Sequence, residues 1–196
     1  MNETKPKRRW FRFSLRTLLV AITSICVLIA AVLFWYRGQE HEHGCQENIA
    51  LRLKTLGAQV LWEKQTPGFL RWSSNLPISE AFQRIYSVSS DNSTIGDANT
   101  NKILDELRDI SSVRSVAIPV HPYFDFGGRP RYAHYRELSD DTIRRLNDIS
   151  SLEELTLYFA GGGNGVYWPD AERRAAISDI HKKLPRVKVM SAGGFG

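Results

Sequence analysis

The segments NKILDELRDISSVRSVAI, residues 101–118, and DDTIRRLNDISSLEELTL, residues 140–157, align without gaps, with Asn101 matched to Asp140 and Ile118 to Leu157. In each copy, three apolar residues spaced three apart predict a short helix, and two spaced two apart predict a half-buried strand. These residues are Leu104, Leu107, Ile110, Val116 and Ile118 in the first copy and Ile143, Leu146, Ile149, Leu155 and Leu157 in the second. Two such helix–turn–strand units in tandem predict parallel strands in one sheet.

Weaker copies of the pattern flank this central pair. Upstream, Ile85–Ser90 has the spacing of a strand, and downstream a helix is expected from Pro169 through Ile180, with the proline at the first helical position. Residues 184–189 (Leu-x-x-Val-x-Val) predict a last strand. Four units are therefore expected, with strand cores that begin at Ile85, Val113, Leu152 and Leu184.

The segment before these units also has predicted structure. Residues 48–56 predict a helix that ends at Gly57, and Gln59–Trp62 predict a strand. Thr100 and Ser139 are the expected N-caps of the two central helices. We therefore expect an α/β domain over residues 48–192 with a short, mainly parallel sheet, followed by a disordered end at residues 193–196.

The N-terminal region contains an uncharged run of 20 residues, from Thr17 to Tyr36. A helix of about 20 residues crosses a hydrocarbon core of roughly 30 Å. Basic and aromatic residues stand where membrane interfaces favour them, namely Arg8, Arg9, Trp10, Arg12, Arg16, Trp35 and Tyr36. The run therefore predicts a single transmembrane signal anchor at residues 17–36, between a basic tail at 1–16 and a juxtamembrane linker at 37–47.

The charges that flank the run predict its orientation. Six Lys or Arg residues precede it, whereas Glu40, Glu42 and Glu47 follow it closely. By the positive-inside rule, the N-terminus is expected in the cytoplasm and the C-terminal domain on the exported side of the inner membrane. A cleaved signal peptide is the main alternative, but its apolar region is shorter and ends in small residues, unlike Trp35-Tyr36. A buried core helix is the other alternative.

The basic tail also accounts for the net charge of +5. Residues 1–16 hold six basic residues and one acidic residue, so the remaining chain has 20 of each sign and is neutral. Nucleic-acid binding needs clustered basic residues, and this balance argues against it. Cys26 lies in the apolar run and Cys45 is the only other cysteine, so no disulfide is expected within the domain.

The anchor entry at residues 13–20 (Phe-Ser-Leu-Arg-Thr-Leu-Leu-Val) resembles that of planctomycete-type single-pass membrane-anchored proteins. The L-x-x-L-x-L strand cores, with a helix before each, resemble degenerate leucine-rich repeats, and residues 56–60 (Leu-Gly-Ala-Gln-Val) fit the same group. The resemblance implies a membrane-anchored protein with a small repeat-like domain. The unit spacings are longer than the usual repeat of about 20–29 residues, and the asparagine that normally follows the strand core is missing.

An insertion after Ile118 is the candidate contact segment. Residues 119–136 are rich in aromatic and arginine side chains, which dominate protein-binding hot spots. The alternative is a loop that folds its aromatic side chains over the end of the sheet. The candidate partner contacts are Tyr123, Phe124, Phe126, Arg129, Arg131, Tyr132, Tyr135 and Arg136.

Other motifs give little support for catalysis. Residues 160–168 are glycine-rich and precede a helix, as in a phosphate-binding loop. Such a site needs a helix N-terminus without negative charge, whereas Asp170 and Glu172 lie in the first turn here. The alternating side chains of His41, His43 and Cys45 could share one side of an extended chain and bind Zn or Cu, or lie in solvent as ordinary linker residues. We expect no catalytic residue, cofactor or bound metal.

The sequence thus favours a non-enzymatic protein-interaction module that is held at the membrane and binds a protein partner outside the cytoplasm. One alternative is a structural envelope component linked through Cys45. The other is a metal-dependent envelope hydrolase that uses His121 or His134.

Overall fold

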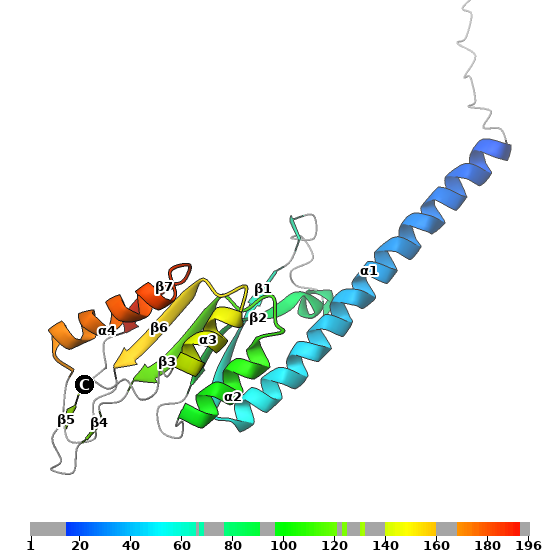
Figure 1. Ribbon diagram of the computed structural model, residues 1–196. Helices are drawn as coiled ribbons and strands as arrows, with labels where there is room; N and C mark the ends of the chain where they lie inside the picture. The colour runs from blue at the N-terminus through cyan, green and yellow to red at the C-terminus, as the bar shows by residue number, and fades with distance from the viewer. Residues whose placement is uncertain are drawn as a thin grey trace, which may run out of the picture. The chain divides into compact units, whose positions relative to one another are not determined.

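The computed structural model describes residues 15–65, 67–68, 77–90, 97–120, 123–124, 130–131, 140–159 and 168–192. The chain divides into two compact parts, residues 1–41 and residues 42–196. The first contains most of one long helix, and the second contains an α/β domain (Figure 1).

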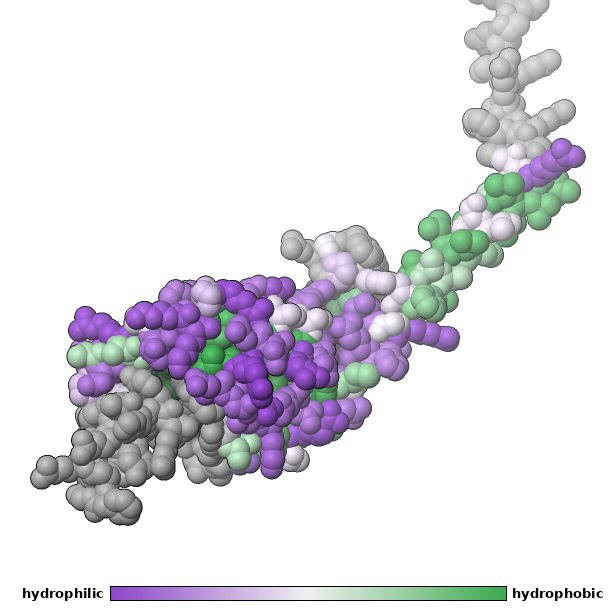
Figure 2. Space-filling model, viewed as in Figure 1, coloured by the Kyte–Doolittle hydropathy of each residue, from purple (hydrophilic) through white to green (hydrophobic). Residues whose placement is uncertain are grey.

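Helix α1 spans Leu15–Thr55, and its N-terminal part is long and apolar enough to cross a membrane. The large apolar side chains from Leu15 to Phe34 are exposed, and Figure 2 shows them as a nearly continuous apolar surface. Two of the three hydroxyls inside this stretch bond to their own helix: Thr23 Oγ1 donates to the Leu19 carbonyl at 2.8 Å, and Ser24 Oγ to the Val20 carbonyl at 2.9 Å. Such bonds satisfy polar groups that lipid cannot.

The C-terminal part of α1 belongs to the α/β domain. Residues 37–47, expected as a linker, lie within α1, and Ala50 and Leu53 are buried in the core of the domain. The helix ends at Thr55, and Gly57 follows with φ 81°. Its position after the helix confirms the predicted stop, because residues with a Cβ rarely adopt this left-handed conformation.

A five-stranded sheet in the order β1-β2-β3-β6-β7 forms one layer of the domain. The first pair is antiparallel and the other three pairs are parallel, so the sheet is mainly parallel as expected. A second, two-residue pairing joins β4 to β5, and a 3-10 helix, η2, precedes β2. The bounds are β1 Ala58–Lys64, η2 Pro77–Phe82, β2 Gln83–Ser90, β3 Ser115–Val120, β4 Tyr123–Phe124, β5 Pro130–Arg131, β6 Glu154–Phe159 and β7 Lys188–Ala192.

The helices form the second layer. Helices α2 (Asp97–Leu107), α3 (Asp140–Asp148) and α4 (Asp170–Lys183) cover the same face of the sheet (Figure 1). Their apolar stripes and the inward strand residues form one buried core. Leu107, Leu146 and Leu155 are fully buried in it, which confirms the predicted helix and strand faces.

The register of the strands follows the sequence repeat. Val116 pairs with Leu155, and the pairs from Ser115↔Glu154 to Ile118↔Leu157 join residues that the repeat aligns; the same offset of 39 continues through Val120↔Phe159. Val88 pairs with Val116, its equivalent in the next unit. The last unit differs, because Leu155 pairs with Val189 rather than with Val187, its equivalent in the predicted unit, and β7 begins only after the buried Val187.

Two helix starts also differ from expectation. Helix α2 begins at Asp97, ahead of the expected N-cap, and Thr100 is buried inside it. Pro169 is the N-cap of α4 rather than its first helical residue, with the extended backbone angles φ −60° and ψ 143°. Ser139, the other expected N-cap, lies outside the described residues, although α3 begins directly after it.

Candidate interaction surface

The sheet has two chemically different faces. Val88, Val116, Leu155 and Val189 lie in one row across four strands and pack toward the helices. Because successive strand residues point to opposite faces, the neighbouring residues in each strand point away from the helices. Helices α2, α3 and α4 lie on the other face (Figure 1), and Ala117 and Pro119 in β3 are buried residues of this second face.

Short hydroxyl-bearing side chains occupy the middle of that second face. Ser87 pairs with Ser115, Ser89 pairs with Ala117, and Ala117 pairs with Thr156 in the next strand. Ser87, Ser89, Ser115 and Thr156 are each partly exposed. We call these four residues the hydroxyl face. A hydroxyl both donates and accepts hydrogen bonds, and a short side chain loses little conformational entropy when a partner covers it.

Larger apolar side chains border the hydroxyl face. Leu61 pairs with Ser87 from β1 and is 64% exposed. Tyr86, the residue that the β1–β2 register skips, is 36% exposed, and Tyr158 and Met190 are partly exposed on β6 and β7. Tyr and Met are enriched in protein interfaces, so this border is the part of the face most suited to protein contact.

Backbone hydrogen bonds between units hold this face in place. The Arg114 N–H donates to the Tyr86 carbonyl at 2.9 Å, and the Glu153 N–H to the Arg114 carbonyl at 2.8 Å. In the last unit the Lys188 N–H donates to the Glu153 carbonyl, also at 2.8 Å. The first two bonds join equivalent residues of neighbouring units, whereas the third is offset by one residue because Lys188 pairs with Glu154.

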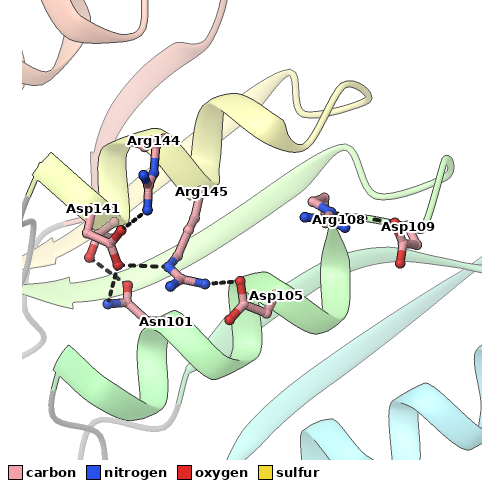
Figure 3. Close-up of polar contacts among 8 residues, drawn as sticks. Asn101, Asp105, Arg108, Asp109, Asp141, Arg144 and Arg145 are labelled. Atoms are coloured by element: carbon pink, nitrogen blue, oxygen red, sulfur yellow. Dashed lines mark hydrogen bonds and ion pairs between the residues drawn. The ribbon is translucent and has the colours of Figure 1, made fainter.

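A polar network joins α2 to α3 on the helix side (Figure 3). Arg145 forms ion pairs with Asp105 of α2 and, at 2.9 Å, with Asp141 of its own helix. The buried Thr142 hydroxyl donates to the Asn101 side-chain carbonyl at 2.8 Å, and the Asn101 amide donates to Asp141 at 3.4 Å. Since each of these groups is satisfied by another in the network, we interpret it as the contact that aligns two repeats rather than as a catalytic cluster.

A second polar cluster fixes the start of β2. The buried Gln46 side chain accepts a hydrogen bond from the Ile85 N–H at 2.9 Å. Arg84 is buried, donates to the Ala81 and Gln83 carbonyls at 2.8 Å, and reaches the Glu42 carboxylate at 3.3 Å. These bonds attach the last turns of α1 to the sheet.

The helical conformation of residues 41–45 separates the alternating metal-ligand candidates. In a helix, residues two apart point in nearly opposite directions, so His41, His43 and Cys45 do not share one side. His43 instead lies 3.1 Å from the Gln83 carbonyl through Nδ1 and packs edge-on against Trp62 at 5.4 Å. Within the described ranges, no group of three or more His, Cys, Asp or Glu side chains is placed to hold a metal ion.

The predicted contact segment, residues 119–136, is described at the end of β3 and at its two short strands, β4 and β5. In the antiparallel pairing of these strands, Tyr123 pairs with Arg131 and Phe124 with Pro130. Five of its candidate contact residues lie outside the described residues: Phe126, Arg129, Tyr132, Tyr135 and Arg136. Among the membrane-interface candidates, Arg16, Trp35 and Tyr36 lie in α1, whereas Arg8, Arg9, Trp10 and Arg12 are outside the described residues.

The sequence analysis missed the hydroxyl face. Its signal was present, because Ser, Ala and Thr occupy the positions between the apolar residues of the strand cores. The apolar positions alone predict the buried face of each strand and say nothing about the residues on the opposite face. Comparisons with models of known protein families, with curated proteins and with solved structures find no match.

Proposed function

We propose that this protein is a single-pass membrane-anchored, non-enzymatic interaction module. Its N-terminus lies in the cytoplasm, and its α/β domain binds a protein partner on the exported side of the inner membrane. The charge asymmetry around residues 17–36 supports this orientation. The exposed apolar surface of α1 supports the anchor, since so long a stretch is costly in water and favourable in lipid.

The hydroxyl face is the single observation that supports the binding role. The four helices cover one face of the sheet, and the other presents Ser87, Ser89, Ser115 and Thr156 next to the exposed Leu61. The insertion at residues 119–136 begins at the end of β3, in the middle of the sheet. We propose that its aromatic and arginine side chains extend the same contact surface.

Site-specific photo-crosslinking in intact cells tests the binding role. A crosslinker at Ser89 or Thr156 should give one discrete adduct with a partner, and a crosslinker at the exposed Ser111 should not. Thr156→Arg should abolish the adduct formed from Ser89, whereas the matched Ser111→Arg should leave it intact. Arg129→Ala and Tyr132→Ala should weaken it if the insertion contributes. Equal labelling from Ser89 and Ser111 would contradict the proposal.

Topology is tested separately. Protease added to the outside of spheroplasts should digest residues 42–196 and spare an epitope placed before residue 5. Protection of the domain in intact spheroplasts would place it in the cytoplasm and reverse the orientation.

A further inference from the structure

The sheet ends at β7, which is paired on one side only. Among the described strands, β7 has β6 as its single neighbour, so the backbone groups along its outer edge have no strand partner. Unpaired strand edges bind extended chains by adding them to the sheet. A site at this edge would be separate from the hydroxyl face.

A cleft of about 310 Å³ lies between this strand and α4. Arg174, Ile177, Ser178 and His181 form its wall; they recur at helical spacing and so lie on one face of α4. Lys188 and Val189 contribute from the strand. The side chains of Ile177 and Val189 are only partly buried, which leaves an apolar surface for one more side chain.

The charge of the cleft is basic. Arg174, His181 and Lys188 line it, and its lining contains no carboxylate. Two of these residues have neighbours: Lys188 lies 3.3 Å from Glu154, and Arg174 donates to the Asp170 backbone carbonyl at 3.3 Å. The positive charge of Arg174 also acts on the Asp170 carboxyl, which is not part of the cleft lining. The cleft therefore complements negative charge.

The alternation of β7 defines which side chains an added strand would need. Val189 points toward the helices in the row of Leu155, whereas Lys188 lies in the row of Glu154 on the opposite face. A chain paired with β7 would place one side chain beside Val189 under Ile177, and the residues before and after it on the face of Lys188. Residues two positions away return to the helix side, where Arg174 and His181 lie.

We propose that the outer edge of β7 binds an extended acidic segment of a partner protein. The segment adds to the sheet as a further strand, with an apolar side chain over Val189 and acidic side chains facing Lys188, Arg174 and His181. Main-chain hydrogen bonds supply affinity, and the basic cleft selects the charge of the segment.

Fluorescence anisotropy with the full chain in lipid nanodiscs tests this site. The probes are the labelled peptides Ac-TEEVEET-NH2 and Ac-TKKVKKT-NH2. We expect the acidic peptide to bind at least about tenfold more tightly, because like charges across an interface are strongly unfavourable. The double variant R174E/K188E should reverse this preference, and the matched variant K102E/R108E on and after α2 should keep it. Equal binding of the two peptides, or no reversal, would overturn the proposal.

Backbone methylation distinguishes strand addition from charge attraction alone. In one version of the acidic peptide the odd-numbered backbone amides are methylated, and in the other the even-numbered ones. Each version therefore lacks hydrogen-bond donors along one of its two strand edges. Only one version should lose binding, because a strand added at β7 uses one of its edges. Similar affinities of the two versions would overturn strand addition. Concentration-dependent self-association of the wild-type chain, abolished by R174E/K188E, would overturn the proposal by assigning the edge to a second copy.

Discussion

Ser112 and Ser151, which occupy equivalent positions in successive units, each form a hydrogen bond with the preceding unit. Each donates a side-chain hydrogen bond to a backbone carbonyl of the unit before it, Ser112 to Ile85 at 2.9 Å and Ser151 to Ile110 at 3.2 Å. The two serines are equivalent in the sequence alignment that also relates the paired strands β3 and β6. The two acceptors are not equivalent, because Ile85 aligns with Val113 rather than with Ile110, so the repeat keeps the donor serine but not its acceptor.

These two serines should differ in their contribution to stability. Ser112 is 6% exposed, so Ser112→Ala leaves a buried carbonyl unsatisfied and should destabilise the domain by about 1–2 kcal/mol. Ser151→Ala should cost less, since water can reach the partly exposed site. Urea denaturation of the full chain in detergent micelles, followed by near-UV circular dichroism, measures both, and the exposed Ser150→Ala serves as the control. A Ser112→Ala variant as stable as wild type would contradict this account.

Two glycines near the end of α1 should respond oppositely to alanine. Gly57 has φ 81°, so Gly57→Ala should destabilise the domain by about 1–2 kcal/mol. Gly44 lies inside the helix, and a Cβ there would meet nothing within 4 Å. Gly44→Ala should therefore stabilise the domain by about 0.5–1 kcal/mol. The same denaturation measurement checks both signs, and stabilisation by Gly57→Ala would show that the turn is misassigned.

Arg84 should matter more than its ion-pair partner. Arg84→Met removes hydrogen bonds to the Ala81 and Gln83 carbonyls in a buried site and should cost about 3 kcal/mol. The Glu42 side chain is 45% exposed, so Glu42→Gln should cost under about 1 kcal/mol. Thermal unfolding of the two variants in nanodiscs tests this order. A larger loss for Glu42→Gln would mean that the ion pair, rather than the carbonyl contacts, holds Arg84.

Membrane retention should depend on the apolar part of α1 alone. Ile25→Arg/Leu28→Arg places two charges in the span and should raise the cost of insertion by about 6 kcal/mol. The matched variant Leu51→Arg/Leu61→Arg changes two side chains of the α/β domain that are 56% and 64% exposed. Alkaline carbonate extraction should release the first variant and not the second. Retention of both would argue against a membrane span at residues 17–36.

Asp170 should show an acid-sensitive contact at the start of α4. The hydrogen bond and the positive charge of Arg173 lower the pKa of its carboxyl below the ordinary value of 3.8. Because the pKa is lower in the folded state, the ionised Asp170 contributes its full stabilisation above the unfolded-state pKa. That stabilisation is lost as the pH falls through the folded-state pKa. Carbon-13 NMR titration should therefore show a low pKa for Asp170 that returns toward 3.8 in Arg173→Ala. An unchanged pKa in that variant would exclude Arg173 as the cause.

The repeat units were predictable because their signals are local. Helix and strand periodicity is a property of neighbouring residues, so the elements around Leu107 and Leu155 could be found from the pattern alone. The β3–β6 register agrees with the alignment of the two central copies, because equivalent residues of stacked repeats lie side by side. The final register could not be predicted, since the turn before Lys188 differs in length from those before the other strands.

The candidate site was only partly predictable. The insertion could be identified from the sequence because its aromatic and arginine residues are contiguous in the chain. The hydroxyl face could not, because its small residues come from three strands that only the sheet brings together. The basic cleft was also missed, because Arg174 and Lys188 meet through the packing of α4 beside β7.

The sequence by itself determined an uncharged apolar span, a neutral remainder and tandem helix–turn–strand units. Composition and periodicity are enough for these, because each depends on residues close together in the chain. The tertiary structure decided that residues 37–47 continue a helix, that β1 pairs antiparallel, and that Arg84 and Gln46 are buried. The burial of the last two depends on hydrogen-bond partners that are distant in the sequence, such as Glu42 for Arg84 and the Ile85 N–H for Gln46. Only the folded chain brings these groups within reach of each other.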